Sequence, residues 1–285
     1  MSINPLISIV MPSFNQVTYI ERAIKSFLDQ DYQYKELIVI DACSSDGSLE
    51  VIKRYATQIK YWVSEEDNGQ SNAINKGLTH SEGDLICWLN SDDVMLPGAL
   101  KKVAYAWQVN NNKKYSWIVG GVVLIDPKER IIKMRQARSF HSTLVKRGIQ
   151  GVFGPSSFLS RELLDQYGYL NEDYHYTMDT ELWIRLSNIG IRYTVVPGYI
   201  WALRLHPEAK TSGYLFPDSP MSDKNHEVWA RISSEHQKIF SIHTSSSLRY
   251  WRGVGKIYTL LSPRTILSII HSILYKGKSL VNCKF

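Results

Sequence analysis

Short apolar segments alternate with helical patterns over the first hundred residues, and this alternation limits the possible folds more than any other feature. The segments 7–11 and 37–40 are rich in β-branched residues and carry no charge, as expected of buried strands. Between them, residues 19–30 repeat apolar side chains at a helical period. The same order continues with strand-like segments at 60–63 and 84–89 and helical ones at about 48–55 and 70–79. The sequence therefore predicts an α/β fold built from βαβ units around a central, largely parallel sheet.

Acidic residues follow three of these predicted strands. Asp41, Asp67 and the pair Asp92-Asp93 all lie just past a strand, so they should meet at the carboxyl edge of the sheet, where open α/β sheets bind ligands. Two adjacent carboxylates repel one another, and an oxygen-only pair favours a hard cation such as Mg²⁺ or Mn²⁺. Taken alone, the dipeptide is better explained as an acidic turn, since Asp is common in turns. Its position beside the other strand ends favours a metal site.

Several common classes of protein are disfavoured by what the sequence lacks. It matches neither G-x-G-x-x-G nor G-x-x-x-x-G-K-[ST], so a bound diphosphate would need its charge neutralised in another way. No run of about 18 apolar residues is present, and residues 1–6 do not resemble a secretory signal. The three cysteines, Cys43, Cys87 and Cys283, are odd in number and far apart, which favours a reducing compartment. We therefore expect a cytoplasmic protein.

Charge divides the chain into two unlike parts. Of its 33 basic residues, eight follow Glu235, and no acidic residue follows it. The preceding part keeps 25 basic against 27 acidic residues, a net charge of −2, although the whole chain carries +6. The two parts are expected to face different partners.

The second half of the chain shows a looser pattern. We expect a helix at 98–109, strands at 117–125, 131–136, 191–196 and 199–205, and a helix that starts near Thr177, the candidate N-cap. Asp179 falls in the first turn of that helix, where the helix dipole favours a carboxylate. From this segment alone, Asp179 is best explained as a helix-start acid and His206 as a surface residue of a polar loop.

The basic C-terminal part contains an amphipathic segment. Pro263 fits the first position of a helix, which would group Ile266, Leu267, Ile269, Ile270, Ile273 and Leu274 on one face. Aromatic and basic residues alternate upstream, at 249–258. Two interpretations are equally favoured: the helix lies on an anionic membrane surface, or it packs on the body of the protein.

Four ordered blocks within residues 5–212 resemble the family 2 glycosyltransferases with the GT-A fold, in particular members of the bacterial polysaccharide type. The blocks are SIVMPSFN at 8–15, LIVID with SSDGS at 37–48, SEEDNGQSNAINKG at 64–77 and WLNSDD at 88–93. The chain departs from the family pattern at Ala42, where many members carry a second acid, and at Asn72, where related sequences often carry Asp.

The resemblance implies a role for particular residues. It implies a divalent cation, Mg²⁺ or Mn²⁺, held by Asp92 and Asp93 with Asp93 as the closer ligand, and Asp179 as the catalytic base. The residues implied for the donor nucleotide are Pro12, Ser13, Phe14, Asp41, Asn72, Lys76 and Asp92, with His206 and Lys210 on a loop over the diphosphate.

The same resemblance implies inverting transfer of a sugar from a nucleotide-diphospho-sugar, expected to be a UDP-sugar, to a glycan or lipid-linked acceptor. It implies a mixed central sheet flanked by helices. Residues 1–215 would form the catalytic domain, with a nucleotide-binding half at about 1–100 and an acceptor half at about 101–215, and 216–285 a helical extension. The protein would be cytoplasmic, at the inner face of the membrane if its tail binds lipid. No nucleic-acid partner is expected.

Two other classes of function stay open. A nucleotidyltransferase would use a similar sheet, but such enzymes normally carry a Gly-rich basic loop after the first strand, unlike residues 12–15 here. A non-enzymatic membrane- or nucleic-acid-binding module would suit the basic tail, but it would leave the acidic strand ends unexplained.

Overall fold

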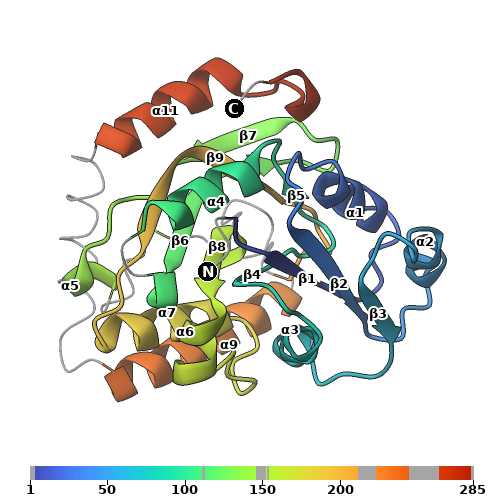
Figure 1. The fold of residues 1–285 in the computed structure, drawn as a ribbon, viewed down its shortest axis with the longest axis horizontal. Coiled ribbons are helices and arrows are strands. Elements are labelled where there is room, and N and C mark those ends of the chain that lie inside the picture. The colour runs from blue at the N-terminus through green and yellow to red at the C-terminus, as the bar shows by residue number, and fades with distance from the viewer. Residues whose placement is uncertain are drawn as a thin grey trace.

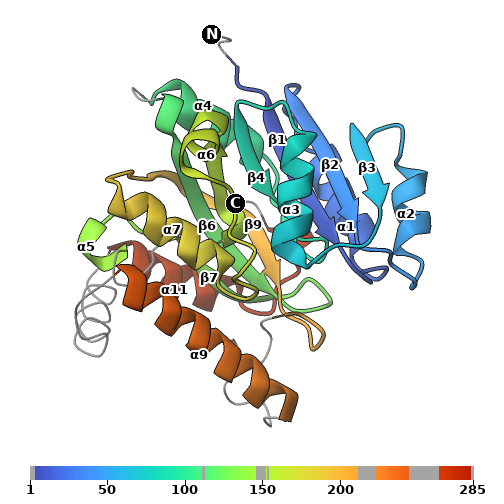
Figure 2. The ribbon, with the colours of Figure 1, turned by 90° about the horizontal axis from the view of Figure 1, so that it is seen from below.

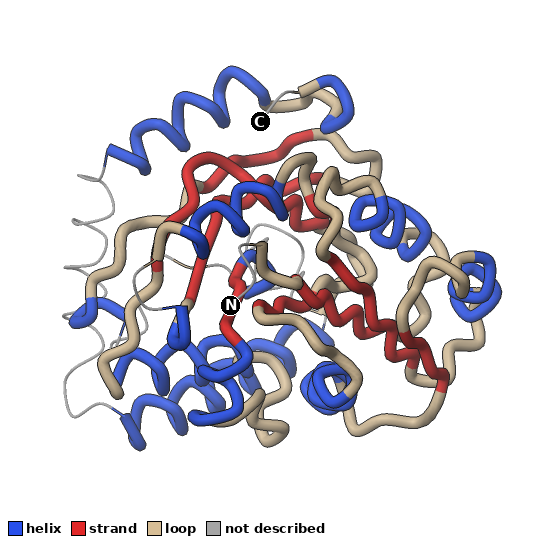
Figure 3. The backbone as a smooth tube through the Cα atoms, viewed as in Figure 1, coloured by secondary structure: helices blue, strands red, loops and turns tan. Residues whose placement is uncertain are grey.

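The computed structural model describes residues 4–110, 113–145, 152, 154–210, 223–243 and 263–283. A central sheet of nine strands runs through the molecule, with helices on both of its faces (Figures 1 and 3). The strand order is β3-β2-β1-β4-β8-β6-β9-β5, and β7 pairs with β6 outside this path. The sheet is mixed: the strands of the N-terminal half, where the sequence predicted βαβ units, are parallel, and β6 and β9 form a further parallel pair.

The predicted βαβ units form the first half of the sheet. Strands β1, β2, β3 and β4 run parallel to one another. Strand β1 lies between β2 and β4, and β3 lies beside β2. Helix α3 covers one face of these strands, as Figure 2 shows. The elements in order are β1 (Ile7–Ser13), α1 (Ile20–Leu28), β2 (Lys35–Asp41), α2 (Ser48–Arg54), β3 (Tyr61–Ser64), α3 (Gln70–Thr79) and β4 (Leu85–Trp88).

The second half of the sheet is mostly antiparallel. Strand β8 joins β4 to β6, and β9 lies beside β6 on the side away from β8. The elements are β5 (Val94–Met95), α4 (Ala99–Gln108), β6 (Trp117–Ile125), β7 (Ile131–Arg135), α5 (Ser142–Val145), β8 (Ser157–Ser160), α6 (Arg161–Tyr167), α7 (Met178–Asn188) and β9 (Thr194–Arg204), with short 3₁₀ turns at Lys113–Tyr115 and Gly154–Ser156.

Two details of these strands differ from the sequence prediction. The expected pair of strands at 191–196 and 199–205 is one strand, β9, which continues through Pro197 and Gly198. Gly198 has a φ of +80°, and the β6–β9 register shifts opposite it, so an irregularity absorbs the break that Pro and Gly were expected to cause. The two-residue strand β5, directly after the acid pair, was not predicted. It pairs with Trp201 and Ala202 of β9.

Alternation along the strands separates two hydrophobic cores. On one face, Ile7, Ile9 and Met11 of β1 pack in the core that α1, α2 and α4 cover. On the other face, Val10 of β1 belongs to the core covered by α3, α6 and α7. The residues on both faces are fully buried, which explains the continuous apolar runs that marked these strands in the sequence.

Among the described residues after β9 there are two α-helices. Helix α9 (Asp223–His243) packs against α7, and α11 (Pro263–Tyr275) lies along the outer edge of β7 (Figures 1 and 2). Helix α11 starts at Pro263, as predicted, and a 3₁₀ turn at Leu280–Asn282 follows it. The aromatic-basic stretch 249–258 lies outside the described residues. Within the described part of the chain, no helix is both long and apolar enough to span a membrane.

Candidate active site

A large cavity opens at the carboxyl ends of β1 and β4. Its volume is about 910 Å³, which is within the range of sites for small-molecule ligands and cofactors. The residues that line it come from the ends of β1, β4 and β9 and from the starts of α3 and α7. They include Pro12, Ser13, Phe14, Asp67, Gln70, Asn90, Asp92, Asp93, Gly154, Asp179, Arg204 and Lys210. Seven of the eleven residues that the family resemblance implied for the site therefore line one cavity.

The wall contributed by β1 offers an apolar surface and an unused hydroxyl. The Phe14 side chain is 61% exposed, although it is a large aromatic ring. The neighbouring Ser13 hydroxyl is buried and makes no hydrogen bond within the described residues. An exposed ring beside an unsatisfied polar atom is an arrangement that a bound ligand would complete.

Asp41, Asn72 and Lys76 support the cavity and are not among its lining residues. The Asp41 carboxylate is fully buried and accepts hydrogen bonds from Ser44 (N 3.0 Å, Oγ 2.5 Å) and from Ser64 Oγ (2.6 Å). It thus holds the loops after β2 and β3 together behind the site.

The other two residues have partners on the outer side of α3. The Asn72 amide donates to Glu172 (2.9 Å), and the Lys76 ammonium donates to the carbonyl of Glu66 (2.8 Å) and pairs with Glu65 (2.9 Å). Lys76 therefore fixes the acidic loop before α3. That loop also contains Asp67, whose carboxylate accepts the Gly69 N–H at 2.7 Å.

The two adjacent carboxylates point in different directions. Asp93 is 2% exposed, and its carboxylate accepts three bonds, from Arg204 N (3.0 Å), Asn90 Nδ2 (3.2 Å) and Trp201 Nε1 (3.3 Å). Burial, followed by the neighbouring Asp92, raises the pKa of Asp93. The Asp92 side chain is 18% exposed, and its Oδ2 lies 3.0 Å from His206 Nε2. Asp92 therefore presents the freer carboxylate to the cavity.

His206 is buried behind Asp92, contrary to the surface position that its loop suggested. Its Nδ1 lies 3.1 Å from Glu208 Oε2. Burial opposes the charged ring, but the hydrogen bonds to Asp92 and Glu208 outweigh it, so the pKa of His206 is raised. The imidazole thereby orients Asp92.

Arg204 holds the backbone of the acidic turn. Its Nε donates to the Asp92 carbonyl at 2.8 Å, its backbone N–H binds Asp93, and its guanidinium pairs with Glu129 at 2.9 Å. The guanidinium also lies over the Tyr19 ring. Arg204 was not predicted, because only the pairing of β9 with β5 brings it to the turn.

A chain of hydrogen bonds crosses the cavity from the 206–210 loop to the acidic turn. Lys210 Nζ donates to Gln70 Oε1 (3.0 Å), and Gln70 Nε2 donates to Asn90 Oδ1 (2.8 Å). Asn90 in turn donates to Asp93. Burial lowers the pKa of Lys210 to about 8. Gln70 was not predicted as a site residue either, since glutamine at a helix start carries no special signal.

Asp179 lies at the start of α7 and borders the cavity. Its Oδ1 accepts the Thr180 N–H at 2.6 Å. A Cβ at Gly154 would lie 2.5 Å from Asp179 Oδ2, so glycine is what lets the backbone approach this carboxylate. Burial raises the pKa of Asp179, although the bond from Thr180 and the nearby charge of Lys210 oppose the rise. A carboxylate of raised pKa beside a cavity can act as a general base.

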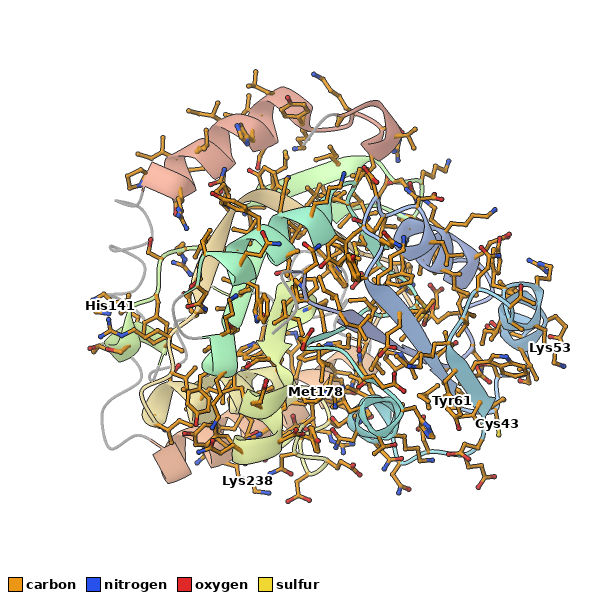
Figure 4. The ribbon with its side chains drawn as sticks, in the orientation of Figure 1. Cys43, Lys53, Tyr61, His141, Met178 and Lys238 are labelled. Atoms are coloured by element: carbon orange, nitrogen blue, oxygen red, sulfur yellow. The ribbon has the colours of Figure 1, made fainter. Side chains whose placement is uncertain are left out.

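The start of α7 is held by Glu235 of α9. The Glu235 carboxylate accepts the backbone N–H groups of His175 (3.0 Å), Tyr176 (2.9 Å) and Thr177 (3.0 Å), together with the Thr177 hydroxyl (2.9 Å). Thr177 has the predicted N-cap position, but its side chain makes no capping bond and donates to Glu235. Figure 4 labels Met178, the first residue of α7, whose sulfur accepts a hydrogen bond from Ser71 of α3. The helix start is thus fixed from two sides.

The donor atoms around Asp92 fit a divalent cation whose ligands would come partly from the protein and partly from a substrate. Among the described residues no group of three or more His, Cys, Asp or Glu side chains is arranged to hold a metal by itself. Mg²⁺ typically binds through one or two carboxylates together with phosphate oxygens and water, and Mn²⁺ favours the same ligands. The Asp92 carboxylate, which His206 holds in place at the cavity wall, suits that mode.

The sequence of this chain matches a known protein family and several curated proteins. The model of the family described as Glycosyl transferase family 2 matches residues 8–168. An uncharacterized glycosyltransferase of Rickettsia felis is 29% identical over 196 residues, which cover 65% of this chain and 32% of that protein. The Campylobacter jejuni GalNAc(5)-diNAcBac-PP-undecaprenol beta-1,3-glucosyltransferase is 28% identical over 191 residues, 64% of this chain and 60% of the relative. The chain spans less than two thirds of the length of either relative.

Two solved structures share the fold at low sequence identity. S. aureus TarS 1–349 in complex with UDP-GlcNAc superposes with a TM-score of 0.58 at 15% identity, over 95% of this chain and 81% of that one. The mannosyltransferase PcManGT of Pyrobaculum calidifontis, in complex with GDP-Man and Mn²⁺, gives 0.52 at 16% identity, over 95% and 86%.

Proposed function

The chain belongs to glycosyl transferase family 2 and has the GT-A type fold that its sequence predicted, and we propose that it performs metal-assisted, inverting sugar transfer from a nucleotide-diphospho-sugar. The observation that carries this proposal is the presence of two carboxylates, Asp92 and Asp179, in the lining of one cavity. Asp92 lies in the turn that follows β4, and Asp179 lies on α7 near Lys210. A donor held at Asp92 would present its sugar toward Asp179.

The wall at the end of β1 is the proposed nucleoside site. The exposed Phe14 ring could stack on a base, and the unsatisfied Ser13 hydroxyl could bond to it. Asp41 would act from behind, by holding the loops that shape this wall. We propose a UDP-sugar as the donor, in keeping with the complex of TarS with UDP-GlcNAc.

The diphosphate is proposed to lie between Asp92 and Lys210. A divalent cation, when bound, would neutralise the diphosphate and so stabilise it as a leaving group. Asp92 would be its protein ligand, since the carboxylate of Asp93, the closer ligand by the family resemblance, is already occupied by three donors. Lys210 would supply a second positive charge, and its bond to Gln70 would keep it over the phosphates.

Asp179 is proposed to remove the proton from the acceptor hydroxyl. Its raised pKa makes it a stronger base than an ordinary aspartate, and Gly154 gives its carboxylate room at the cavity wall. The hydroxyl oxygen would then attack the anomeric carbon from the side opposite the diphosphate, which inverts the configuration. No protein acid is required, because the leaving group departs as a charge-neutralised diphosphate.

The acceptor is proposed to be a glycan or a lipid-linked glycan precursor. This rests on the name of the Campylobacter relative, whose acceptor carries undecaprenol. An acceptor of that kind would be reached from the cytoplasmic face of the membrane, where free thiols such as Cys43 also persist.

A panel of nucleotides tests the proposed function directly. The protein is expected to melt at a higher temperature with UDP-sugars and Mn²⁺ than with either alone, and to release UDP from one of these donors when a glycan acceptor is added. Nucleoside triphosphates with sugar 1-phosphates serve as the control. Release of pyrophosphate from that mixture, without transfer from any nucleotide sugar, would instead identify a nucleotidyltransferase.

Glu235 is expected to be a positioning residue for the proposed base. Replacing it with alanine leaves three N–H groups at the start of α7, one buried and two part-buried, without their acceptor, at a cost of about 1–3 kcal/mol in the free energy of unfolding. Because Asp179 follows directly, kcat should fall by about 10–100-fold, with a smaller change in KM for the donor. Urea unfolding and steady-state kinetics measure the two effects.

Two further variants separate positioning from general destabilisation. Glu235→Gln keeps a carbonyl oxygen and should recover part of kcat. Glu227→Ala, on the same helix, is the control and should behave as wild type. If Glu235→Ala lost stability but kept its full kcat at a temperature where it is folded, the positioning role would be disproved.

A further inference from the structure

Helix α11 packs on the protein through its polar side. Ser268 and Ser272 accept the backbone N–H groups of Gln136 and Met134, both at 2.9 Å, and Ser272 also donates to the Met134 carbonyl. Arg264 donates to the carbonyl of Ala137 at 3.0 Å. Strand β7 pairs with β6 along one edge, so the serines of α11 satisfy backbone groups of the other edge and of the residues just beyond it.

The apolar side of the helix consequently faces outward. An amphipathic helix on a globular body normally turns its apolar side inward, but here the buried position is Ser268. Side chains along the outer side of α11 project away from the body in Figure 4. Six large aliphatic side chains between 40% and 74% exposed form this surface, which we call the α11 face: Ile266, Leu267, Ile269, Ile270, Ile273 and Leu274.

A surface of this kind calls for a partner. Scattered exposed aliphatic residues are ordinary, but six within nine consecutive positions of one helix form a contiguous apolar patch. Val281, in the 3₁₀ turn that follows, is 75% exposed, while its neighbour Leu280 is buried and anchors the turn. A further apolar side chain is therefore exposed just past α11, on a turn that is itself fixed to the body.

The charges around the α11 face select the partner. Lys276 and Lys278 follow the helix directly, and Lys133 of β7 is exposed beside it. The acidic residues that precede β7 are neutralised, Glu129 by Arg22 and Arg204 and Asp126 by Arg130. No acidic residue follows Glu235 in the sequence. A second copy of this face would bring like charges together, whereas an anionic lipid surface would be attracted.

We propose that the α11 face binds the interface of an anionic phospholipid bilayer, with the helix parallel to the membrane plane. Thirteen residues of helix extend about 20 Å, less than the roughly 30 Å hydrocarbon core, so α11 lies on the bilayer. The aliphatic side chains enter the boundary between headgroups and acyl chains, and the lysines contact the headgroups. Since the serine contacts fix α11 to the sheet, binding also orients the cavity relative to the membrane. This inference rests on the geometry of α11 and does not depend on the reaction proposed above.

Vesicle flotation of the full chain tests the proposal. The protein should float with vesicles of phosphatidylcholine and phosphatidylglycerol. A smaller fraction should float with vesicles of phosphatidylcholine alone, and also at about 0.5 M salt, because salt screens the attraction between the lysines and the anionic headgroups. The double variant Ile269→Gln/Ile273→Gln should bind at least about tenfold more weakly, because two exposed aliphatic side chains become polar. The matched control, Tyr105→Gln/Val109→Gln, changes two apolar residues of similar exposure on α4 and at its C-cap, and it should float like wild type.

Three outcomes would contradict the proposal. Equal flotation of the Ile269→Gln/Ile273→Gln variant and the wild type would exclude the α11 face, and absence of flotation would exclude a membrane partner. A concentration-dependent dimer that the same variant abolishes, without flotation, would identify a second copy as the occupant. Thermal unfolding and UDP-sugar binding, measured on the same samples, verify that the variants are folded. If the Ile269→Gln/Ile273→Gln variant lost flotation but still transferred sugar to a soluble acceptor at the wild-type rate, the result would support the proposal for α11. It would also leave the proposed reaction intact.

Discussion

The Asp179→Asn variant is expected to transfer sugar at least about 10³-fold more slowly than the wild type, while its affinity for the donor changes by less than about threefold. General bases typically contribute 10²–10⁴-fold, and asparagine keeps the size of the side chain but cannot accept the proton. Asp179 lies at the start of α7, whereas Phe14, Ser13 and Asp92 form the proposed donor wall, so donor binding should persist. Stopped assays of transfer and calorimetric titration of the donor measure the two quantities separately.

The pH profile supplies a second sign of the same base. Because burial raises the pKa of Asp179, activity should be lost with falling pH above the usual range of an aspartate. A protonated Asp179 carboxylate cannot take the proton of the acceptor hydroxyl, so activity falls as the pH falls. Asp173→Asn, an exposed change on the loop before α7, should leave rate and profile unaltered. Substantial turnover by Asp179→Asn, or an unchanged acid limb in it, would remove Asp179 from this role.

Removing divalent cations is expected to lower transfer by about 100-fold or more, with recovery on adding Mn²⁺. Without the cation, the negative charge of the leaving diphosphate would not be neutralised, and it would lie near the negative charge of Asp92. Asp92→Asn should weaken Mn²⁺ binding in the presence of UDP, because the proposed ligand loses its negative charge. Calorimetric titration of Mn²⁺ into the UDP-bound protein measures this without reference to turnover. Full activity of the metal-free protein would contradict the proposed role of the cation.

Asp93→Asn should behave differently from Asp92→Asn. The Asp93 carboxylate accepts bonds from Arg204, Trp201 and Asn90, and the amide group of an asparagine would face one of these donors. The main effect should be a loss of about 1–3 kcal/mol in the free energy of unfolding. If Asp93→Asn kept its stability and lost Mn²⁺ binding, Asp93 would be the closer ligand, as the family resemblance implied.

The sequence predicted the parts of this structure that depend on local periodicity. Buried strands read as continuous apolar runs, and the order of strands and helices up to Trp88 followed from them. The cavity at the carboxyl edge followed as well, because parallel strands bring their ends together. Asp92 and Asp179, 87 positions apart, could be assigned to one site only through the family resemblance, since no local pattern relates them.

The missed features depend on contacts between distant segments. Arg204 reaches the acidic turn through the pairing of β5 with β9, and Glu235 reaches α7 from a helix that follows the predicted catalytic domain. The orientation of α11 was also beyond the pattern, because an amphipathic period is the same whichever side is packed. What decided it was the backbone of β7, whose N–H groups needed acceptors that serines could supply.

The hydrogen bonds of Glu235 show that a residue outside the predicted catalytic domain supports the candidate active site. Residues 1–215, the catalytic domain predicted from the sequence, contain every proposed reacting group but not the carboxylate that fixes the start of α7. A fragment cut there would keep the nucleotide wall intact and leave the base on a frayed helix end. We therefore expect the catalytic unit to extend through α9, so any attempt to transplant this active site has to carry that helix with it.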